Sequence, residues 1–401
     1  MAFSSNCQMS QNLTASAKTD PIRYVTDQKT VKIFFSAAEP SGDNHAAKVI
    51  SRLKVAIPHV QISGLGGPNM ERSGCKLLEN MVDRSAMLLH VLGKMLMFYQ
   101  RLRRLKSYFS RERPDLVVVV DSFAWNIHIA KAAFSMGIPV VFFVAPQFWA
   151  WAPWRIKKLK KTDGKVACIL PFEEKWFCDR GVDAVSVGHP LFEDLNRDSE
   201  SKLRPVEDLF PNVALLPGSR QHEIGHLWPA MLEIARNIKN AFPEARFSTV
   251  TTDDFSAEKM RAMADPLLGI EIRRAGIDSI TANADLTLVA SGTATLQVAA
   301  QHCPMIVMYY VHPLQWHLLG RWLLNIPHLF LVNILAQREL VPEFMPFYKQ
   351  THEVSQTALD LLASKGKRDT MSNDLKNLID PLRPSQTSQK VTDLIEKMIN
   401  K

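Results

Sequence analysis

The feature that most constrains the fold is an apolar run, Leu116-Val-Val-Val-Val120, which is followed at once by Asp121. An unbroken β-branched run of this kind is typical of a strand that is buried on both faces of its sheet. Such a strand needs helices on both sides, and it therefore predicts parallel strands joined by helical crossovers. Ligands of these sheets bind beyond the carboxyl ends of the strands, which is where Asp121 lies.

The same alternation of strand, polar turn and helix recurs in both halves of the chain. We expect strands at 31–38, 60–67, 115–121, 138–144, 165–171 and 184–190, and then at 213–216, 245–252, 270–273, 284–290 and 305–311. This predicts an α/β protein with two Rossmann-like, doubly wound domains that face a central cleft. The expected parts are a leader at 1–29, a first domain at 30–194, a linker at 195–212, a second domain at 213–375 and a C-terminal helix at 376–401.

Composition narrows the possible functions. A chain of 401 residues fits two domains, and it has neither an apolar run of about 18 residues nor the start of a secretory signal. Its five cysteines show no metal-ligand spacing, which predicts reduced thiols in a cytoplasm and no metal site. A net charge of +8 favours an anionic partner. GxGxxG, GxxxxGK[ST] and nucleic-acid-binding patterns are absent, so a dehydrogenase, a P-loop NTPase or a nucleic-acid binder is not expected.

Two turns in the second half resemble anion-binding sites. Pro217-Gly-Ser-Arg220 joins an expected strand to an expected helix, so backbone N–H groups and the positive end of the helix would face a ligand. Arg220 could add bidentate contacts to a phosphate, although an ordinary turn with a surface arginine has the same sequence. Ser291-Gly-Thr293 precedes another helix in the same way and predicts a second anion cradle.

The first half offers candidates whose roles the sequence leaves open. Ser41 and Asp43 follow the first strand and could either cap a helix from about residue 44 or face a ligand. The loop 145–154 is rich in aromatic residues and could form a wall for a sugar or apolar substrate, or could simply pack. His189 ends the last strand of this half, and a lone histidine there is more often structural than catalytic.

The stretch 85–109 begins apolar and ends basic, with Met95, Leu96 and Phe98 before Arg101 and Arg103. A helix of this kind can lie in an anionic membrane surface, because hydrocarbon buries the apolar part and headgroups attract the basic part. The alternative is a core helix with a solvated basic end.

Six segments, taken in order, resemble the signature segments of the lipid-A-disaccharide synthase family. They are Glu39-Pro-Ser-Gly-Asp43, Ala145-Pro-Gln-Phe-Trp-Ala-Trp151, Gly188-His-Pro190, Leu216-Pro-Gly-Ser-Arg220 with Glu223, Ser291-Gly-Thr-Ala-Thr-Leu296, and the segment 333–344. The resemblance covers roughly residues 31–345. It implies a GT-B glycosyltransferase that works without a metal or other cofactor, peripherally, at the cytoplasmic face of the inner membrane.

The implied reaction is an inverting hexosyl transfer in lipid A and lipopolysaccharide biosynthesis. A 2,3-diacylglucosamine unit would pass from UDP to 2,3-diacylglucosamine 1-phosphate with a β-1,6 linkage, releasing UDP. The base that takes the acceptor proton would be Asp121, Asp43 or Glu39. The donor residues would be Gly218, Ser219, Arg220, Glu223, Ser291, Gly292, Thr293 and Gln297. The acceptor and its loops would involve Ser41, Gly42, Asn126, Gln147, Trp149 and His189.

The chain departs from the family pattern at three positions. Ala124 replaces the second acid of the segment that starts at Asp121, Gln297 replaces a glutamate, and Gln337 replaces a glycine. These changes leave two alternatives open beside an active synthase. One is a catalytically impaired homologue that binds UDP or lipid, and the other is a glycosyltransferase with another acceptor.

Overall fold

The computed structural model describes residues 30–81, 91–195, 210–251, 253–311, 328–345, 351–383 and 385–400, without the side chains of 91–97 and 194–195. The expected leader at 1–29 and most of the expected linker at 195–212 lie outside these residues. So does the beginning of the stretch at 85–109.

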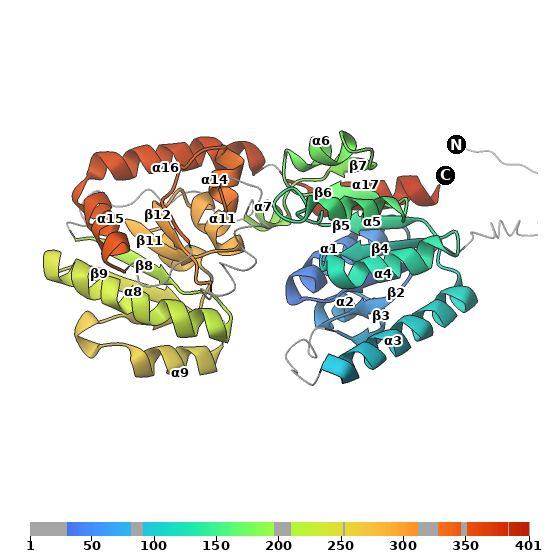
Figure 1. Cartoon of the computed structure of the whole chain (residues 1–401), viewed down its shortest axis with the longest axis horizontal. Helices are drawn as coiled ribbons and strands as arrows, with labels where there is room; N and C mark the ends of the chain where they lie inside the picture. The colour runs from blue at the N-terminus through green and yellow to red at the C-terminus, as the bar shows by residue number, and fades with distance from the viewer. Residues whose placement is uncertain are drawn as a thin grey trace, which may run out of the picture. The chain divides into compact units, whose positions relative to one another are not determined.

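The first sheet has seven parallel strands in the described residues, in the order β3-β2-β1-β4-β5-β6-β7 (Figure 1). Its strands are β1 (Lys32–Ala37), β2 (Gln61–Gly66), β3 (Lys76–Asn80), β4 (Leu116–Val120), β5 (Val140–Phe143), β6 (Lys165–Cys168) and β7 (Ala184–Ser186). Its helical segments are α1 (Pro40–Ala56), α2 (Pro68–Arg72), α3 (Val91–Glu112), α4 (Phe123–Phe134), η1 (Pro153–Arg155), α5 (Ile156–Lys160), α6 (Glu173–Cys178) and α7 (Pro190–Leu195). The chain reverses its winding direction between β1 and β4, which places a topological switch point there.

The second sheet repeats this plan with six parallel strands in the described residues, ordered β10-β9-β8-β11-β12-β13. Its strands are β8 (Asn212–Leu216), β9 (Arg246–Val250), β10 (Glu271–Arg273), β11 (Leu286–Ala290), β12 (Met305–Met308) and β13 (Glu343–Phe344). The helical segments of this half are α8 (Gln221–Ala241), α9 (Asp254–Met263), η2 (Pro266–Leu268), α10 (Asp278–Thr281), α11 (Thr293–Ala300), α14 (Leu331–Ala336), α15 (Thr351–Ala363), α16 (Lys365–Ile379) and η4 (Asp380–Leu382). The chain then continues into a last helix, α17 (Thr387–Ile399). Both halves therefore have the α/β, doubly wound architecture that the sequence predicts.

Side-chain alternation divides the core of the first sheet into two layers. Ile33 and Phe35 of β1 pack with α1, whereas Phe34 between them packs with α3 and α4 on the other face. All five residues of β4 are buried because both faces of this central strand are covered. The prediction of a strand that is buried on both faces of its sheet is thus confirmed.

The last helix, α17, belongs to the first sheet and not to the second. Val391, Leu394 and Ile395 are buried in the same core layer as α1, and Figure 1 shows α17 beside that sheet. The region expected as one helix at 376–401 is divided, because α16 ends at Ile379 and α17 begins at Thr387. The chain therefore returns to its first half before it ends.

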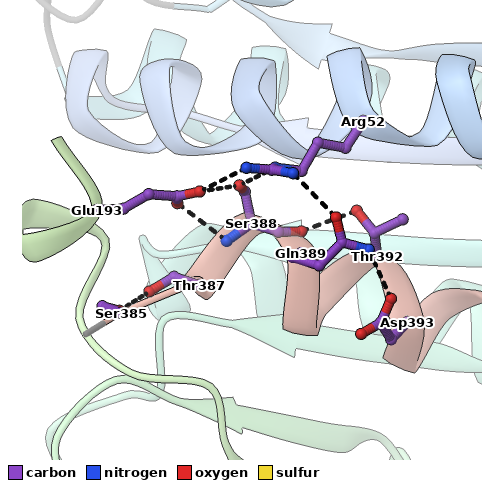
Figure 2. Close-up of polar contacts among 8 residues, drawn as sticks. All are labelled: Arg52, Glu193, Ser385, Thr387, Ser388, Gln389, Thr392 and Asp393. Carbon is purple, nitrogen blue, oxygen red and sulfur yellow. Dashed lines mark hydrogen bonds and ion pairs between the residues drawn. The ribbon is translucent and has the colours of Figure 1, made fainter. Parts of the chain in front are cut away.

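A polar network holds the beginning of α17 against α1 and α7 (Figure 2). Arg52 of α1 donates from Nε to Ser388 Oγ at 2.5 Å and from Nη1 to Gln389 Oε1 at 2.9 Å. Glu193 of α7 accepts from Arg52 Nη2 at 3.2 Å and from the N–H of Ser388 at 3.0 Å. Because a carboxylate at a helix N-terminus satisfies otherwise unpaired N–H groups, Glu193 both caps α17 and neutralises Arg52.

Helix α3 is a core helix in its C-terminal half. Leu105 and Phe109 are buried against the first sheet, and Arg101 forms a 2.7 Å ion pair with Glu79 of β3. The described helices include none with the length and apolar character that crossing a membrane requires.

We predict that Gln337→Gly stabilises the protein. Gln337 is exposed and ends α14 at φ +54°, in the left-handed region that suits glycine. Relief of the Cβ strain there should raise the free energy of unfolding by about 0.5–1 kcal/mol, measured by denaturant titration. Gln301→Gly is the matched control: Gln301 ends α11 at φ −90°, where glycine relieves nothing and should lower stability. A lower stability for Gln337→Gly would contradict the prediction.

Candidate functional site

A cavity of about 450 Å³ lies at the carboxyl ends of the strands of the second sheet. Both predicted anion cradles border it, since Gly218, Ser219 and Arg220 follow β8 and Ser291 follows β11. All the residues expected at the donor line this one cavity: Gly218, Ser219, Arg220, Glu223, Ser291, Gly292, Thr293 and Gln297. The structure thus brings together residues that are about 70 positions apart in sequence.

Glu223 fixes the shape of the first turn. Its Oε2 accepts the N–H of Arg220 at 3.2 Å, and its Oε1 accepts Nη1 of the same arginine at 3.0 Å. Gly218 has φ +97°, and a Cβ added there would lie 2.3 Å from Glu223 Oε2. Glycine is therefore required at Gly218, and Glu223 positions the turn instead of meeting an anion itself. The Arg220 side chain is 68% exposed although it borders the cavity.

The second turn starts α11. Gly292 precedes the helix at φ +137°, and its carbonyl accepts Thr295 Oγ1 at 2.8 Å. The first turn of α11 borders the cavity, which directs N–H groups and the positive end of the helix towards it. Gln297 lies one helical turn further on and presents a neutral amide that can both donate and accept.

Sequence reasoning missed the part of the cavity that follows β9 and β10. Val250, Thr251, Ser256, Gly276 and Ile277 line it there. Val250 and Thr251 lie at the end of the expected strand 245–252, and the others follow an expected strand, so the rule that points to strand carboxyl ends could have found them. Their residue types carry no recognisable motif, which is why they were not singled out.

In the first half, Asp121 lies at the carboxyl end of β4 on a strained backbone. Asp121 and Ser122 have φ values of +53° and +41°, a conformation that costs energy for residues other than glycine and is concentrated at functional sites. Asp121 Oδ1 accepts the N–H of Ser122 at 2.7 Å, and Ser122 Oγ donates to Glu39 Oε1 at 3.0 Å. Burial raises the pKa of Asp121, and the charge of Glu39 raises it further, although the hydrogen bond from the Ser122 N–H lowers it.

Asn126 maintains this strained turn. It is fully buried, and its Nδ2 donates to the carbonyls of Val120 at 3.0 Å and Asp121 at 2.7 Å. Its Oδ1 accepts Ser36 Oγ at 2.8 Å. The expectation that Asn126 touches the acceptor is therefore corrected, because its amide is occupied by the turn that presents Asp121.

Asp43 has a structural role that the sequence did not reveal. Helix α1 begins at Pro40, earlier than expected, and buries Asp43 within its first turn. The carboxylate accepts three backbone N–H groups, from Gly67 at 2.8 Å, Asn69 at 2.9 Å and Met70 at 3.1 Å. It thus caps α2 across the core, and both of its oxygens are occupied by these backbone N–H groups. Asp43 is removed from the candidate bases.

Two other residues of the Glu39–Asp43 segment differ in exposure. Gly42 is buried, and a Cβ there would lie 3.4 Å from both Ala37 Cβ and the Val120 carbonyl, so a small residue lets α1 approach the sheet. Ser41 is exposed beside Glu39 at the same edge.

The aromatic loop before η1 divides into packing and exposed residues. Trp149 is buried, and its Nε1 donates to Glu173 Oε1 at 3.0 Å. Glu173 Oε2 also accepts the N–H groups of Ile169 and Leu170, each at 3.0 Å. Burial raises the pKa of Glu173 to about 7 although these three donors favour its charged form. Trp149 is therefore a packing residue, whereas Gln147 is exposed.

His189 is a structural residue beside the returning C-terminal segment. It is nearly buried, its Nδ1 accepts the N–H of Leu191 at 3.2 Å, and burial lowers its pKa to about 4 with help from His45. Gly188 has φ +82°, and a Cβ there would lie 2.7 Å from Ser385 Oγ. Glycine at position 188 therefore lets this turn lie against Ser385, just before α17. The expected acceptor role of His189 is not supported.

Comparison with known proteins identifies the family. The family model described as lipid-A-disaccharide synthetase matches residues 33–396. The chain belongs to this family. The lipid-A-disaccharide synthase of Syntrophus aciditrophicus is 32% identical over 358 residues, covering 87% of this chain and 93% of that one. That of Coxiella burnetii is 31% identical over 373 residues, covering 92% and 98%.

Solved structures agree with the fold. A UDP-N-acetylglucosamine 2-epimerase from Listeria monocytogenes, described as putative, has a TM-score of 0.62 at 13% identity, covering 92% of this chain and 96% of its own. MurG of Acinetobacter baumannii has a TM-score of 0.56 at 15% identity, covering 92% and 99%. The chain therefore has the GT-B fold. As a member of the lipid-A-disaccharide synthetase family it is a UDP-sugar glycosyltransferase of lipid A biosynthesis.

We predict that Asp43→Asn destabilises the protein. The amide would turn an NH₂ group towards N–H donors that now share the two carboxylate oxygens of Asp43. The mismatch should cost about 1–3 kcal/mol, visible as a lower Tm. Asp163→Asn, in an exposed loop, serves as control. An unchanged Tm together with a large loss of turnover would instead restore Asp43 as a base.

Proposed function

We propose that this enzyme transfers 2,3-diacylglucosamine from UDP to 2,3-diacylglucosamine 1-phosphate, forming the β-1,6 disaccharide with inversion and releasing UDP. The observation that carries the proposal is the single cavity bordered by both anion cradles and Arg220. The second domain, 213–375, would hold the donor, and the first, 30–194, the acceptor and the membrane.

The donor diphosphate would lie between the turns at 218–220 and 291–293. Backbone N–H groups and Arg220 would stabilise the charge that grows on the leaving phosphate, as preorganised donors do in a partly enclosed site. Arg220 would have to exchange its contact with Glu223 for the phosphate. The remaining cavity, beside Thr251 and Gly276, would accept the nucleoside, and the Gln297 amide would replace a carboxylate at the ribose.

Asp121 would act as the general base. Its carboxylate would take the proton of the acceptor 6-hydroxyl while that oxygen attacks the anomeric carbon of the donor. The bond from this carbon to the diphosphate oxygen breaks at the same time, and UDP leaves with the electron pair. Glu39, exposed and joined to the turn by Ser122, would supply the neighbouring charge that Ala124 does not.

The acyl chains of both substrates imply an enzyme that works at a bilayer. The first part of α3 would dock on the anionic inner face of the inner membrane, with Met95 and Leu96 in the apolar layer and Arg103 and Arg104 at the headgroups. The buried second half of α3 would anchor it to the first sheet.

Incubation of the purified protein with UDP-2,3-diacylglucosamine and 2,3-diacylglucosamine 1-phosphate tests the function directly. Disaccharide 1-phosphate and UDP should form in equal amounts. UDP binding without disaccharide would favour an impaired homologue, and turnover only with a different acceptor would favour the other alternative.

We predict that Arg220→Ala lowers kcat/KM by about 10²–10³-fold, because a cation lost from the developing diphosphate charge costs a few kcal/mol of transition-state stabilisation. Arg274→Ala is the control: Arg274 is exposed in the same half and forms a surface ion pair with Asp254. Equal kinetics for the two variants would show that Arg220 is not at the diphosphate.

We predict that Asp121→Asn lowers the single-turnover rate by at least about 10²-fold with little change in UDP affinity. Activity should fall as pH decreases through the pKa of Asp121, because only the ionised carboxylate accepts a proton. Glu39→Gln keeps an acceptor for Ser122 but removes the charge that raises this pKa. The acid limb of the pH–rate profile should therefore move to lower pH. An acid limb unchanged in Glu39→Gln and full activity of Asp121→Asn would refute the assignment.

A further inference from the structure

The segment from the end of the aromatic loop through α5 forms an exposed surface of unusual composition. We call it the aromatic-basic surface and define it by Trp151, Trp154, Arg155, Lys157 and Lys158. The mechanism above uses none of these residues. Between Ala145 and Thr162 the sequence contains no acidic residue.

Two tryptophans give this surface its apolar part. The side chains of Trp151 and Trp154 belong to residues that are 41% and 59% exposed, whereas Trp149 in the same loop is buried. The guanidinium of Arg155 lies 4.3 Å from the centre of the Trp151 ring, which holds this ring at the surface. Exposed tryptophan beside cations is typical of the boundary between a bilayer and water, where the ring body meets the apolar layer and the N–H meets water.

Helix α5 separates its apolar and charged residues cleanly. Ile156 and Leu159 are buried in the core of the first sheet, and Lys157 and Lys158 are exposed on the other side. In the part of the chain that the structure describes, neither lysine has an ion-pair partner. Their charge is therefore available to an external anion.

The surface is connected to the proposed acceptor site. The rings of Phe148 and Phe123 meet edge to face with centroids 4.7 Å apart, which places the loop beside the start of α4, directly after Asp121. Burial lowers the pKa of His128 on α4, and the charges of Lys131 and Lys158 lower it further. The His128 ring in turn packs 4.9 Å from Phe98 of α3. The aromatic-basic surface and the helix proposed to meet the membrane thus both lie beside α4.

We propose that the aromatic-basic surface is a second membrane contact, which binds the headgroups of anionic phospholipids with Lys157 and Lys158 and the interfacial layer with Trp151 and Trp154. This rests on the proposed function, because lipid substrates must reach Asp121 from a bilayer. A single amphipathic helix holds a protein loosely, and two adjacent contacts hold it at a fixed angle. Contacts at α3 and at α5 would together border the turn that carries Asp121.

Co-sedimentation of the full chain with phosphatidylcholine vesicles, with and without about 30% phosphatidylglycerol, tests the proposal. Each basic residue near an anionic surface strengthens binding by about fivefold. The double variant Lys157→Gln with Lys158→Gln should therefore partition roughly 20- to 30-fold more weakly into anionic vesicles, with a smaller salt dependence. Trp151→Ser with Trp154→Ser should weaken binding at every salt concentration.

Matched controls come from the second half of the chain. Lys365→Gln with Lys367→Gln removes two lysines of α16, and Phe255→Ser with Leu267→Ser removes two apolar side chains that are 67% and 86% exposed. Both controls should bind vesicles as wild type does. Unchanged UDP affinity and Tm in all variants would show that each is folded.

The proposal would be overturned if both aromatic-basic variants bound vesicles as wild type does. In that outcome only the triple variant Met95→Ser, Leu96→Ser, Phe98→Ser would lose binding. Binding that does not depend on phosphatidylglycerol would also overturn it, as would retention on duplex DNA with none on vesicles. The vesicle assay needs no substrate. Loss of binding in the variants would therefore support this surface even if the wild type made no disaccharide.

Discussion

The catalytic half of the molecule depends on one buried amide. Asn126 donates to the carbonyls at the end of β4 and accepts the Ser36 hydroxyl at the end of β1, so it joins the two strands at the switch point of the sheet. A buried polar group with several good partners strongly favours a single arrangement, because losing any partner leaves an unsatisfied group in the core. This amide holds the left-handed turn at Asp121 and Ser122, together with the hydrogen bond from Ser122 to Glu39.

In the second half a charged side chain, that of Glu223, holds the corresponding turn. Glu223 holds the turn after β8 through the Arg220 backbone, and glycine at position 218 leaves room for its carboxylate. The two halves thus share an arrangement in which a side chain in the helix after the strand reaches back to hold the turn. In each case the residue that shapes the site is distinct from the residue proposed to do the chemistry.

The sequence predicted the structure correctly wherever a local pattern of residues determines it. The β-branched run at 116–120 predicted a central buried strand, and the glycines and serines after β8 and β11 pointed to two turns that line one cavity in the structure. It failed where a role depends on contacts across the fold. Asp43 resembled a base because nothing near it in sequence shows that it caps α2. The turn that contains His189 approaches Ser385, which lies 197 residues after Gly188 in sequence. The return of α17 to the first sheet is equally invisible, because its apolar face would fit either core.

The departures at Ala124 and Gln297 raise the question of whether this site is still used, and the backbone bears on it. Left-handed conformations at Asp121 and Ser122 cost of order 1–3 kcal/mol each. A chain that had lost catalysis could remove this strain with small changes to the turn and gain stability, since most proteins lie only a little above the stability they need. Instead the strained turn persists together with the buried amide that maintains it and the Glu39 contact beside it. Ala124 is exposed at the start of α4, so the substitution leaves these contacts in place. The contacts that present Asp121 are thus complete without an acid at position 124, which favours an active synthase over an impaired homologue.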